Sequence, residues 1–213
     1  MNQLQIDQLI LLTIKRLGIN GEGIGYYKRL AVFVDNTIPG EVVEVKIIET
    51  KDKYAIGEVV KFKETSKERI TPPCKYYDKC GGCQIQHMSY AEQLRQKQLL
   101  VVEAFDRYYE GNLRKIRFNE TLGMEYPWRY RNKSSLPVRH DGTKVVVGMY
   151  AKNSNHLVYI EDSMVENELI TKKRQEILDV LTKSQVDIYN PKSKTGSLKY
   201  IVIRGFEETN EED

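Results

Sequence analysis

The segment that decides the fold of this chain reads Val42-Val43-Glu44-Val45-Lys46-Ile47-Ile48. Successive side chains of an extended strand point to opposite faces, so the residues at alternate positions, Val43, Val45 and Ile47, share one face. The two charged residues between them lie on the other face, and the alternation breaks at either end of the segment. This pattern predicts a β-strand that buries one face in a core.

Similar short runs flank this segment, rich in Val, Ile, Thr and Tyr and separated by Gly, Asn and Pro. Such spacing is typical of antiparallel strands joined by tight turns. We expect one small barrel, closed or partly open, because closure removes the unpaired edges of a short sheet. The predicted strands are residues 8–17, 30–35, 41–49 and 54–62, and a polar connector follows at 63–73.

A helix is predicted after residue 89. Ser89 and Glu92 have the spacing of a capping box, in which each side chain bonds the backbone N–H of the other residue. Apolar residues then recur on one helical face. They are Ala91, Leu94, Val101, Phe105 and Tyr108.

The remainder of the chain predicts a smaller α+β part. We expect strands at 129–138 and 144–160 joined by a turn at His140-Asp141-Gly142, a helix at 167–182 and a strand at 198–204. The expected buried stripe of that helix is Leu169, Ile170, Ile177, Val180 and Leu181. The fold class is therefore mainly β with an α+β part. The predicted divisions are a barrel at 1–62, a linker with cysteines and a helix at 63–110, a central domain at 111–204 and an acidic tail at 205–213.

Composition excludes several classes of protein. The 213 residues include 33 Lys and Arg against 30 Asp and Glu, a formal net charge of +3. No apolar run approaches the roughly 20 residues that a membrane span needs, so a membrane partner is not expected. The N-terminus lacks the basic region, apolar stretch and cleavage site of a signal peptide, which predicts a cytoplasmic location.

The three cysteines of the chain, Cys74, Cys80 and Cys83, lie within ten residues of one another. Thiolates so closely spaced favour a metal or iron–sulfur centre over a disulfide framework. Iron–sulfur clusters usually take four thiolates, whereas zinc accepts mixed Cys and His sets, and His87 is an alternative fourth ligand for zinc. Three ordinary reduced cysteines remain the simplest alternative.

Several motifs together resemble the 23S rRNA (uracil-5)-methyltransferases, and the resemblance covers nearly the whole chain. Residues 8–62 resemble the TRAM domain of that family, an OB-like RNA-binding barrel, through Gly-Glu-Gly-Ile-Gly at 21–25, Val-Phe-Val at 32–34, Pro-Gly-Glu at 39–41 and Tyr-Ala-Ile-Gly at 54–57. The other motifs are Arg-Ile-Thr-Pro-Pro at 69–73, Cys-x5-Cys-Gly-Gly-Cys-Gln-Ile-Gln-His-Met-Ser-Tyr at 74–90, Tyr-Pro-Trp-Arg-Tyr-Arg-Asn-Lys at 126–133 and Val-Gly-Met-Tyr at 147–150. The resemblance implies methyl transfer from S-adenosylmethionine to ribosomal RNA and a 4Fe-4S cluster.

Two departures from the family stand out. Ser163 occupies the position where the family has its fourth cluster cysteine, and a serine oxygen is a poorer ligand for iron than a thiolate. The resemblance also implies a Rossmann-like catalytic domain with a nucleophilic cysteine and a glutamate base, both of which would lie beyond Asp213. We therefore expect no catalytic or cofactor-binding residues in this chain, S-adenosylmethionine binding only in the complete enzyme, and an inactive chain on its own.

The glycines Gly21, Gly23 and Gly25 superficially resemble a cofactor-binding loop. A loop of that kind needs a following helix whose N-terminus faces the ligand, and a Val-rich strand follows here instead. We interpret these glycines as a hairpin or bulge of the barrel.

Residues 126–152 carry six basic side chains and one acidic side chain, interleaved with aromatic rings. Cations that hold phosphates and rings that stack on unpaired bases suit single-stranded RNA, and no DNA partner is expected. The predicted RNA-binding residues are Trp128, Arg129, Tyr130, Arg131, Lys133 and Lys152. The rings are alternatively core residues beside a solvated charged face. A stand-alone RNA-binding module with a structural iron–sulfur or zinc site and no catalysis is the alternative function.

Overall fold

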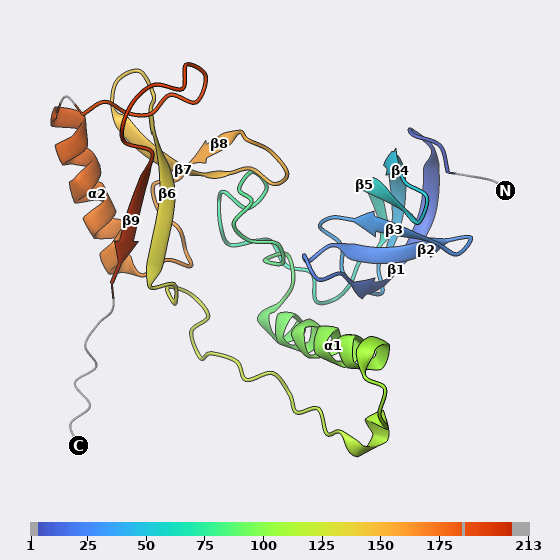
Figure 1. The fold of residues 1–213 in the computed structure, drawn as a ribbon. Coiled ribbons are helices and arrows are strands. Elements are labelled where there is room, and N and C mark those ends of the chain that lie inside the picture. Colours follow the sequence, from blue (N-terminus) through green and yellow to red (C-terminus); the bar gives the residue numbers. More distant parts are fainter. Residues whose placement is uncertain (1–3, 185, 206–213) are drawn as a thin grey trace, which may run out of the picture. The chain divides into compact units, whose positions relative to one another are not determined.

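The computed structural model describes residues 4–184 and 186–205 of the chain (Figure 1). The chain forms two compact units. The first contains the residues up to 73 together with 84–123, and the second contains 74–83 together with the residues from 124 onward. The acidic tail predicted from 205 falls, from residue 206, outside the described residues.

The first unit contains a closed five-stranded barrel, which confirms the barrel prediction. Its strand order is β1-β2-β3-β5-β4, with β4 returning to β1, and only the β3–β5 pair among these strands is parallel. The strands are β1 (Leu9–Leu17), β2 (Gly23–Tyr27), β3 (Leu30–Val34), β4 (Val42–Thr50) and β5 (Tyr54–Glu64).

The barrel core is formed by the side chains that alternation places inside. Val43, Val45 and Ile47 of β4 are completely buried, as predicted from the deciding segment. They pack with apolar residues of the other strands, among them Ile10, Leu12, Ile14, Val32, Val34 and Ala55.

Gly23 and Gly25 lie in strand β2, and Gly21 lies just before it. A Cβ atom on Gly23 would lie 2.0 Å from Oγ1 of Thr37, and one on Gly25 would lie 2.6 Å from Cγ of Leu12. The register between β1 and β2 shifts between Ile14 and Arg16, as in a bulge. These two glycines are therefore required by close packing inside the barrel, which agrees with the interpretation as a hairpin or bulge.

Helix α1 (Tyr90–Tyr108) begins at the predicted cap, but the capping box is only half formed. Oγ of Ser89 accepts a hydrogen bond from the Glu92 N–H at 3.2 Å. The N–H of Ser89 donates instead to the carbonyl oxygen of Glu68, and the Glu92 carboxylate accepts from Arg95 and Gln96. The reciprocal bond of the box is therefore replaced by the bond from the Ser89 N–H to Glu68.

The predicted buried stripe of α1 is wrong. Its buried residues are Glu92 and Gln96, which satisfy each other by a hydrogen bond, whereas Val101, Phe105 and Tyr108 are exposed. Phe105 packs edge-on against Phe118, from the segment after the short 3-10 turn Leu113–Lys115, rather than against the barrel core.

The second unit contains a four-stranded antiparallel sheet of order β8-β7-β6-β9 and one long helix (Figure 1). The predicted strand at 144–160 is two strands, because the chain turns at 151–156. The predicted turn at 140–142 joins β6 to β7. The elements are β6 (Lys133–His140), β7 (Val145–Tyr150), β8 (Leu157–Tyr159), α2 (Glu168–Lys183) and β9 (Tyr200–Arg204).

Helix α2 covers one face of this sheet through a stripe that differs from the predicted one. Ile170, Arg174 and Leu178 are buried, one turn apart, and Leu181 is partly buried. Three members of the predicted stripe are exposed, because the sheet contacts the face that carries Arg174. They are Leu169, Ile177 and Val180. Among the described residues, no helix has the length and apolar character needed to cross a membrane.

Candidate nucleic-acid interface and cysteine loop

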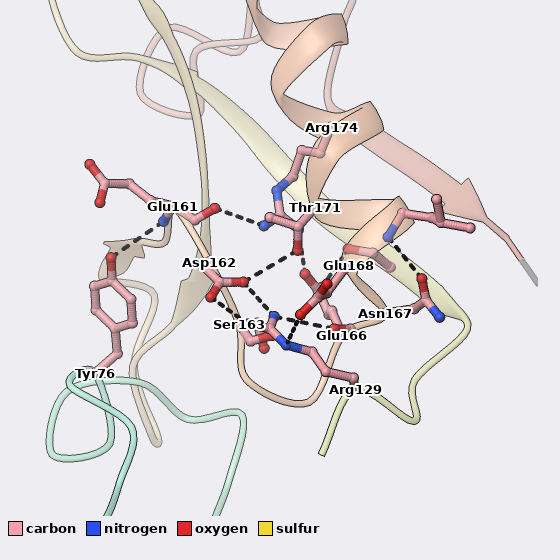
Figure 2. Close-up of polar contacts among 12 residues, drawn as sticks. Tyr76, Arg129, Glu161, Asp162, Ser163, Glu166, Asn167, Glu168, Thr171 and Arg174 are labelled. Atoms are coloured by element: carbon pink, nitrogen blue, oxygen red, sulfur yellow. Dashed lines mark hydrogen bonds and ion pairs between the residues drawn. The ribbon is translucent and has the colours of Figure 1, made fainter.

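Residues 74–83, here called the cysteine loop, pack within the second unit. The N–H of Gly81 donates to the carbonyl oxygen of Tyr150 at 3.0 Å, at the end of β7. The hydroxyl of Tyr76 accepts from the N–H of Glu161 at 3.4 Å (Figure 2), and Nζ of Lys75 lies 3.5 Å from the Glu161 carboxylate. The loop is thus held against the end of β7 and the segment that follows β8.

The three cysteines of this loop are half-buried and form no disulfide bond. Burial raises the pKa of the Cys80 thiol, and the nearby Cys83 and Cys74 add to the rise. A 3.3 Å hydrogen bond from the Gly82 N–H to Sγ of Cys80 acts in the opposite direction. Without a metal ion, Cys80 is therefore a neutral thiol at neutral pH.

The residues do not fit a complete metal site as they are arranged. Within the described part of the chain, no three Cys, His, Asp or Glu side chains gather closely enough to hold a metal ion. His87 is buried in the first unit, with Nε2 3.4 Å from the carbonyl oxygen of Thr37. Ser163 is half-buried, and its carbonyl oxygen accepts from Arg129. The iron–sulfur and zinc interpretations stay predictions.

Arg129 organises the segment that precedes α2 (Figure 2). Its guanidinium donates to both carboxylate oxygens of Asp162, at 2.6 and 2.8 Å, and to the carbonyl oxygen of Ser163 at 2.9 Å. The Arg129 guanidinium also lowers the pKa of Asp162. Its positive φ of 58° is uncommon for a non-glycine residue. Arg129, predicted to grip phosphate, is thus engaged within the protein.

A second, buried ion pair links this segment to α2. The Arg174 guanidinium of α2 contacts the Glu166 carboxylate and donates to the carbonyl oxygen of Glu161 at 3.0 Å. The hydroxyl of Ser134 on β6 donates to Glu166 at 2.7 Å. This network joins β6, the 161–166 segment and α2. No sequence signal pointed to it, because Arg174 stands among other charged residues of α2.

The other predicted RNA-binding residues occupy different environments. Arg131 is half-buried and holds the 161–168 segment through its backbone, with its N–H donating to Val165 and its carbonyl oxygen accepting from Asn167. Tyr130, Lys133 and Lys152 are exposed, and Trp128 is half-buried.

In the first unit, the motif at 69–73 begins with a structural arginine. Arg69 donates through Nε and Nη2 to both carboxylate oxygens of Glu41, each at 2.7 Å. Burial alone would raise the pKa of the Glu41 carboxyl, but bonds from Arg69, Ile38 and Ser66 lower it overall. Arg69 therefore fastens the connector to the barrel.

Comparison with known proteins supports the barrel assignment. Residues 4–60 match the TRAM domain family. The chain is 40% identical over 210 residues to a protein of Bacillus anthracis named as an uncharacterized RNA methyltransferase. It is also 40% identical over 205 residues to a Halalkalibacterium halodurans protein of the same description. These matches cover 99% and 96% of this chain but 46% and 44% of the relatives, so the chain spans about half of their length.

A solved structure shares the fold. The crystal structure of Pyrococcus abyssi tRNA (uracil-54, C5)-methyltransferase in complex with S-adenosyl-L-homocysteine superposes with a TM-score of 0.61. The match covers 91% of this chain and 42% of that chain, at 19% sequence identity. This similarity extends beyond the barrel.

Proposed function

We propose that this chain is the RNA-recognition portion of an S-adenosylmethionine-dependent RNA (uracil-C5)-methyltransferase whose substrate is 23S ribosomal RNA. The observation that carries this proposal is the 40% identity to RNA methyltransferases along 99% of the chain. The TRAM match at 4–60 supports RNA as the partner. A cytoplasmic location would follow from that substrate.

The chain's own residues serve binding and positioning in this proposal. Uracil C5 methylation needs a thiolate that adds to C6 and a base that removes the C5 proton. All three cysteines lie in the cysteine loop, where burial raises the pKa of the Cys80 thiol. We therefore assign no covalent step to the residues of this chain.

S-adenosylmethionine would supply the methyl group, but the glycines at 21–25 do not fit it. Gly23 and Gly25 are packed against Thr37 and Leu12 in the barrel, so their backbone does not offer a cradle for a ligand. We propose that the cofactor is held by other parts of the complete enzyme.

An iron–sulfur cluster at Cys74, Cys80 and Cys83 is a separate proposal. It is supported by their spacing and by the hydrogen bond from the Gly82 N–H to Sγ of Cys80, a bond of the kind that stabilises cluster sulfurs. Binding would require the thiols to move closer than they lie here.

The function is tested by competition and by methyl transfer. Fluorescently labelled 23S rRNA fragments, displaced from the chain by unlabelled rRNA or tRNA, should show tighter binding of rRNA. The chain alone, given tritiated S-adenosylmethionine and rRNA, should transfer no methyl group. Preference for tRNA would contradict the proposal that 23S rRNA is the substrate. Methylation by the chain alone would contradict the proposal that catalysis belongs to other parts of the complete enzyme. RNA binding by a protein without any methyltransferase partner would favour the stand-alone module.

A further inference from the structure

The four-stranded sheet of the second unit has one face covered by α2 and one open face. Alternation and register assign the residues of each strand to these faces, because directly paired residues lie on the same side. On the α2 side lie Leu136, Val138, Val147 and Ile201 of the core. The open face carries Lys133, Ser135, Pro137 and Arg139 of β6, Val146, Gly148 and Tyr150 of β7, Leu157 and Tyr159 of β8, and Tyr200, Val202 and Arg204 of β9.

Three tyrosines stand on the open face, one from each of three strands. Their exposed fractions are 37% for Tyr150, 48% for Tyr159 and 49% for Tyr200. Tyr159 is paired with Gly148, and Tyr200 is paired with Pro137. The two central strands thus place Gly148 and Pro137, which are both buried, between the outer rings, so the exposed surface of this row belongs to the two tyrosines.

Polar contacts hold these rings in place. Nη2 of Arg139 donates to the hydroxyl of Tyr150 at 3.3 Å. The hydroxyls of Tyr150 and Tyr200 share a hydrogen bond, which raises the pKa of Tyr200. The two rings are thus linked across the sheet before any ligand arrives.

The charge on this face is positive. Lys133 and Arg204 are exposed and directly paired at one end of β6 and β9, and Arg139 is half-buried further along β6. Among the described residues that the register assigns to the open face, none is acidic. An anionic partner is favoured over a neutral or cationic one.

We propose that this open face is a stacking platform for unpaired nucleotides of the RNA. This inference rests on the RNA partner proposed above. Tyr150, Tyr159 and Tyr200 stack on bases, while Lys133, Arg139 and Arg204 contact phosphates. Exposed rings on a sheet reach the faces of splayed bases, which are hidden by stacking in a duplex. The residues of this surface are distant in sequence and are brought together by the pairing of the four strands.

The platform is tested by fluorescence anisotropy with a labelled oligouridylate. The double variant Tyr150→Ala/Tyr200→Ala should weaken binding by about ten-fold or more, because each stacked base contributes substantially to affinity. The variant Tyr150→Phe/Tyr200→Phe keeps both rings and should retain most of the affinity. Tyr108→Ala is the matched control, since this ring is exposed on α1 of the first unit. Lys133→Gln and Arg204→Gln should each lower the salt slope of log K by about 0.7.

A second measurement does not depend on variants. Oligouridylate containing 4-thiouridine, irradiated with the full chain, should crosslink to peptides from β7, β8 and β9. Normal binding by the double alanine variant, or crosslinks confined to the first unit, would overturn the platform while leaving RNA recognition intact. Failure of the unmodified chain to bind any RNA would overturn both this inference and the proposed function.

Discussion

Arg129 holds Asp162 through two parallel hydrogen bonds, from Nη1 at 2.6 Å and from Nη2 at 2.8 Å. The same guanidinium reaches the carbonyl oxygen of Ser163, so one side chain fixes the start of the segment that leads into α2. A bidentate pair of this kind is geometrically specific. Arg129 belongs to the basic stretch that predicted RNA binding, yet its contacts assign it to the architecture of the second unit.

Arg129→Gln should therefore lower stability. A double-mutant cycle with Asp162→Asn should give a coupling free energy of about 0.5–1 kcal/mol, because both groups are partly exposed. Urea unfolding measures it. The matched control Lys133→Gln, an exposed neighbour, should leave stability within about 0.5 kcal/mol. If Arg129→Gln reduced RNA affinity and left stability unchanged, the result would support the original prediction that Arg129 binds RNA phosphates.

Arg174→Met should destabilise the second unit by about 3–5 kcal/mol, because it leaves the buried Glu166 carboxylate without its cation. Adding Glu166→Gln should recover part of this loss, since a neutral amide needs no counter-charge. Thermal unfolding followed by circular dichroism measures both effects. Lys173→Met, one position away and exposed, serves as control. Equal stability of the Arg174 and Lys173 variants would show that the buried pair contributes little.

Glu41→Gln should make the first unit less sensitive to acid. The folded-state pKa of Glu41 is lowered, so its contribution is fully present above its ordinary pKa of 4.5 and is lost as pH falls through the lowered value. The variant should be about 2–3 kcal/mol less stable at neutral pH, since charge-assisted bonds from Arg69 are lost. Urea unfolding at neutral and acidic pH should show the difference shrinking in acid. A constant difference would argue against this carboxylate as the source.

Ser163→Cys should increase iron bound per chain if the cysteine loop holds a cluster, because it supplies a fourth thiolate. Iron analysis and visible absorption of anaerobically prepared protein measure the effect. Ser154→Cys adds a thiol on an exposed turn of the same unit and is the control. Equal iron contents in the two variants would count against Ser163 as the fourth position, and colourless protein containing zinc would favour the zinc interpretation.

The sequence predicted the barrel well, because the centre of the deciding strand alternates and because Gly, Asn and Pro separate the strands. Residues 23–27 did not read as a strand, since glycine is a poor strand former. Their role depends on Thr37 and Leu12, whose approach is set by barrel closure. Packing of this kind is not visible in a local pattern.

Helix positions were predicted better than helix faces. Helix α1 begins at the expected cap, Ser89, and helix α2 begins after Asn167, the position predicted as its start. The buried faces instead centre on Gln96 and Arg174, polar residues that partners satisfy after folding. Hydrophobic periodicity cannot identify a polar residue whose burial depends on a partner. The tyrosine platform was missed for a similar reason, since β9 joins β6 only across a long stretch of sequence.

The most direct test of RNA recognition compares one labelled strand in two states. The chain is titrated at low salt with a single-stranded oligouridylate and with the same strand annealed to its complement. We predict clearly tighter binding of the single strand, weakening steeply as salt increases, because unpaired bases stack while phosphates release counterions. Equal affinity for both states, or no binding to either, would contradict the account.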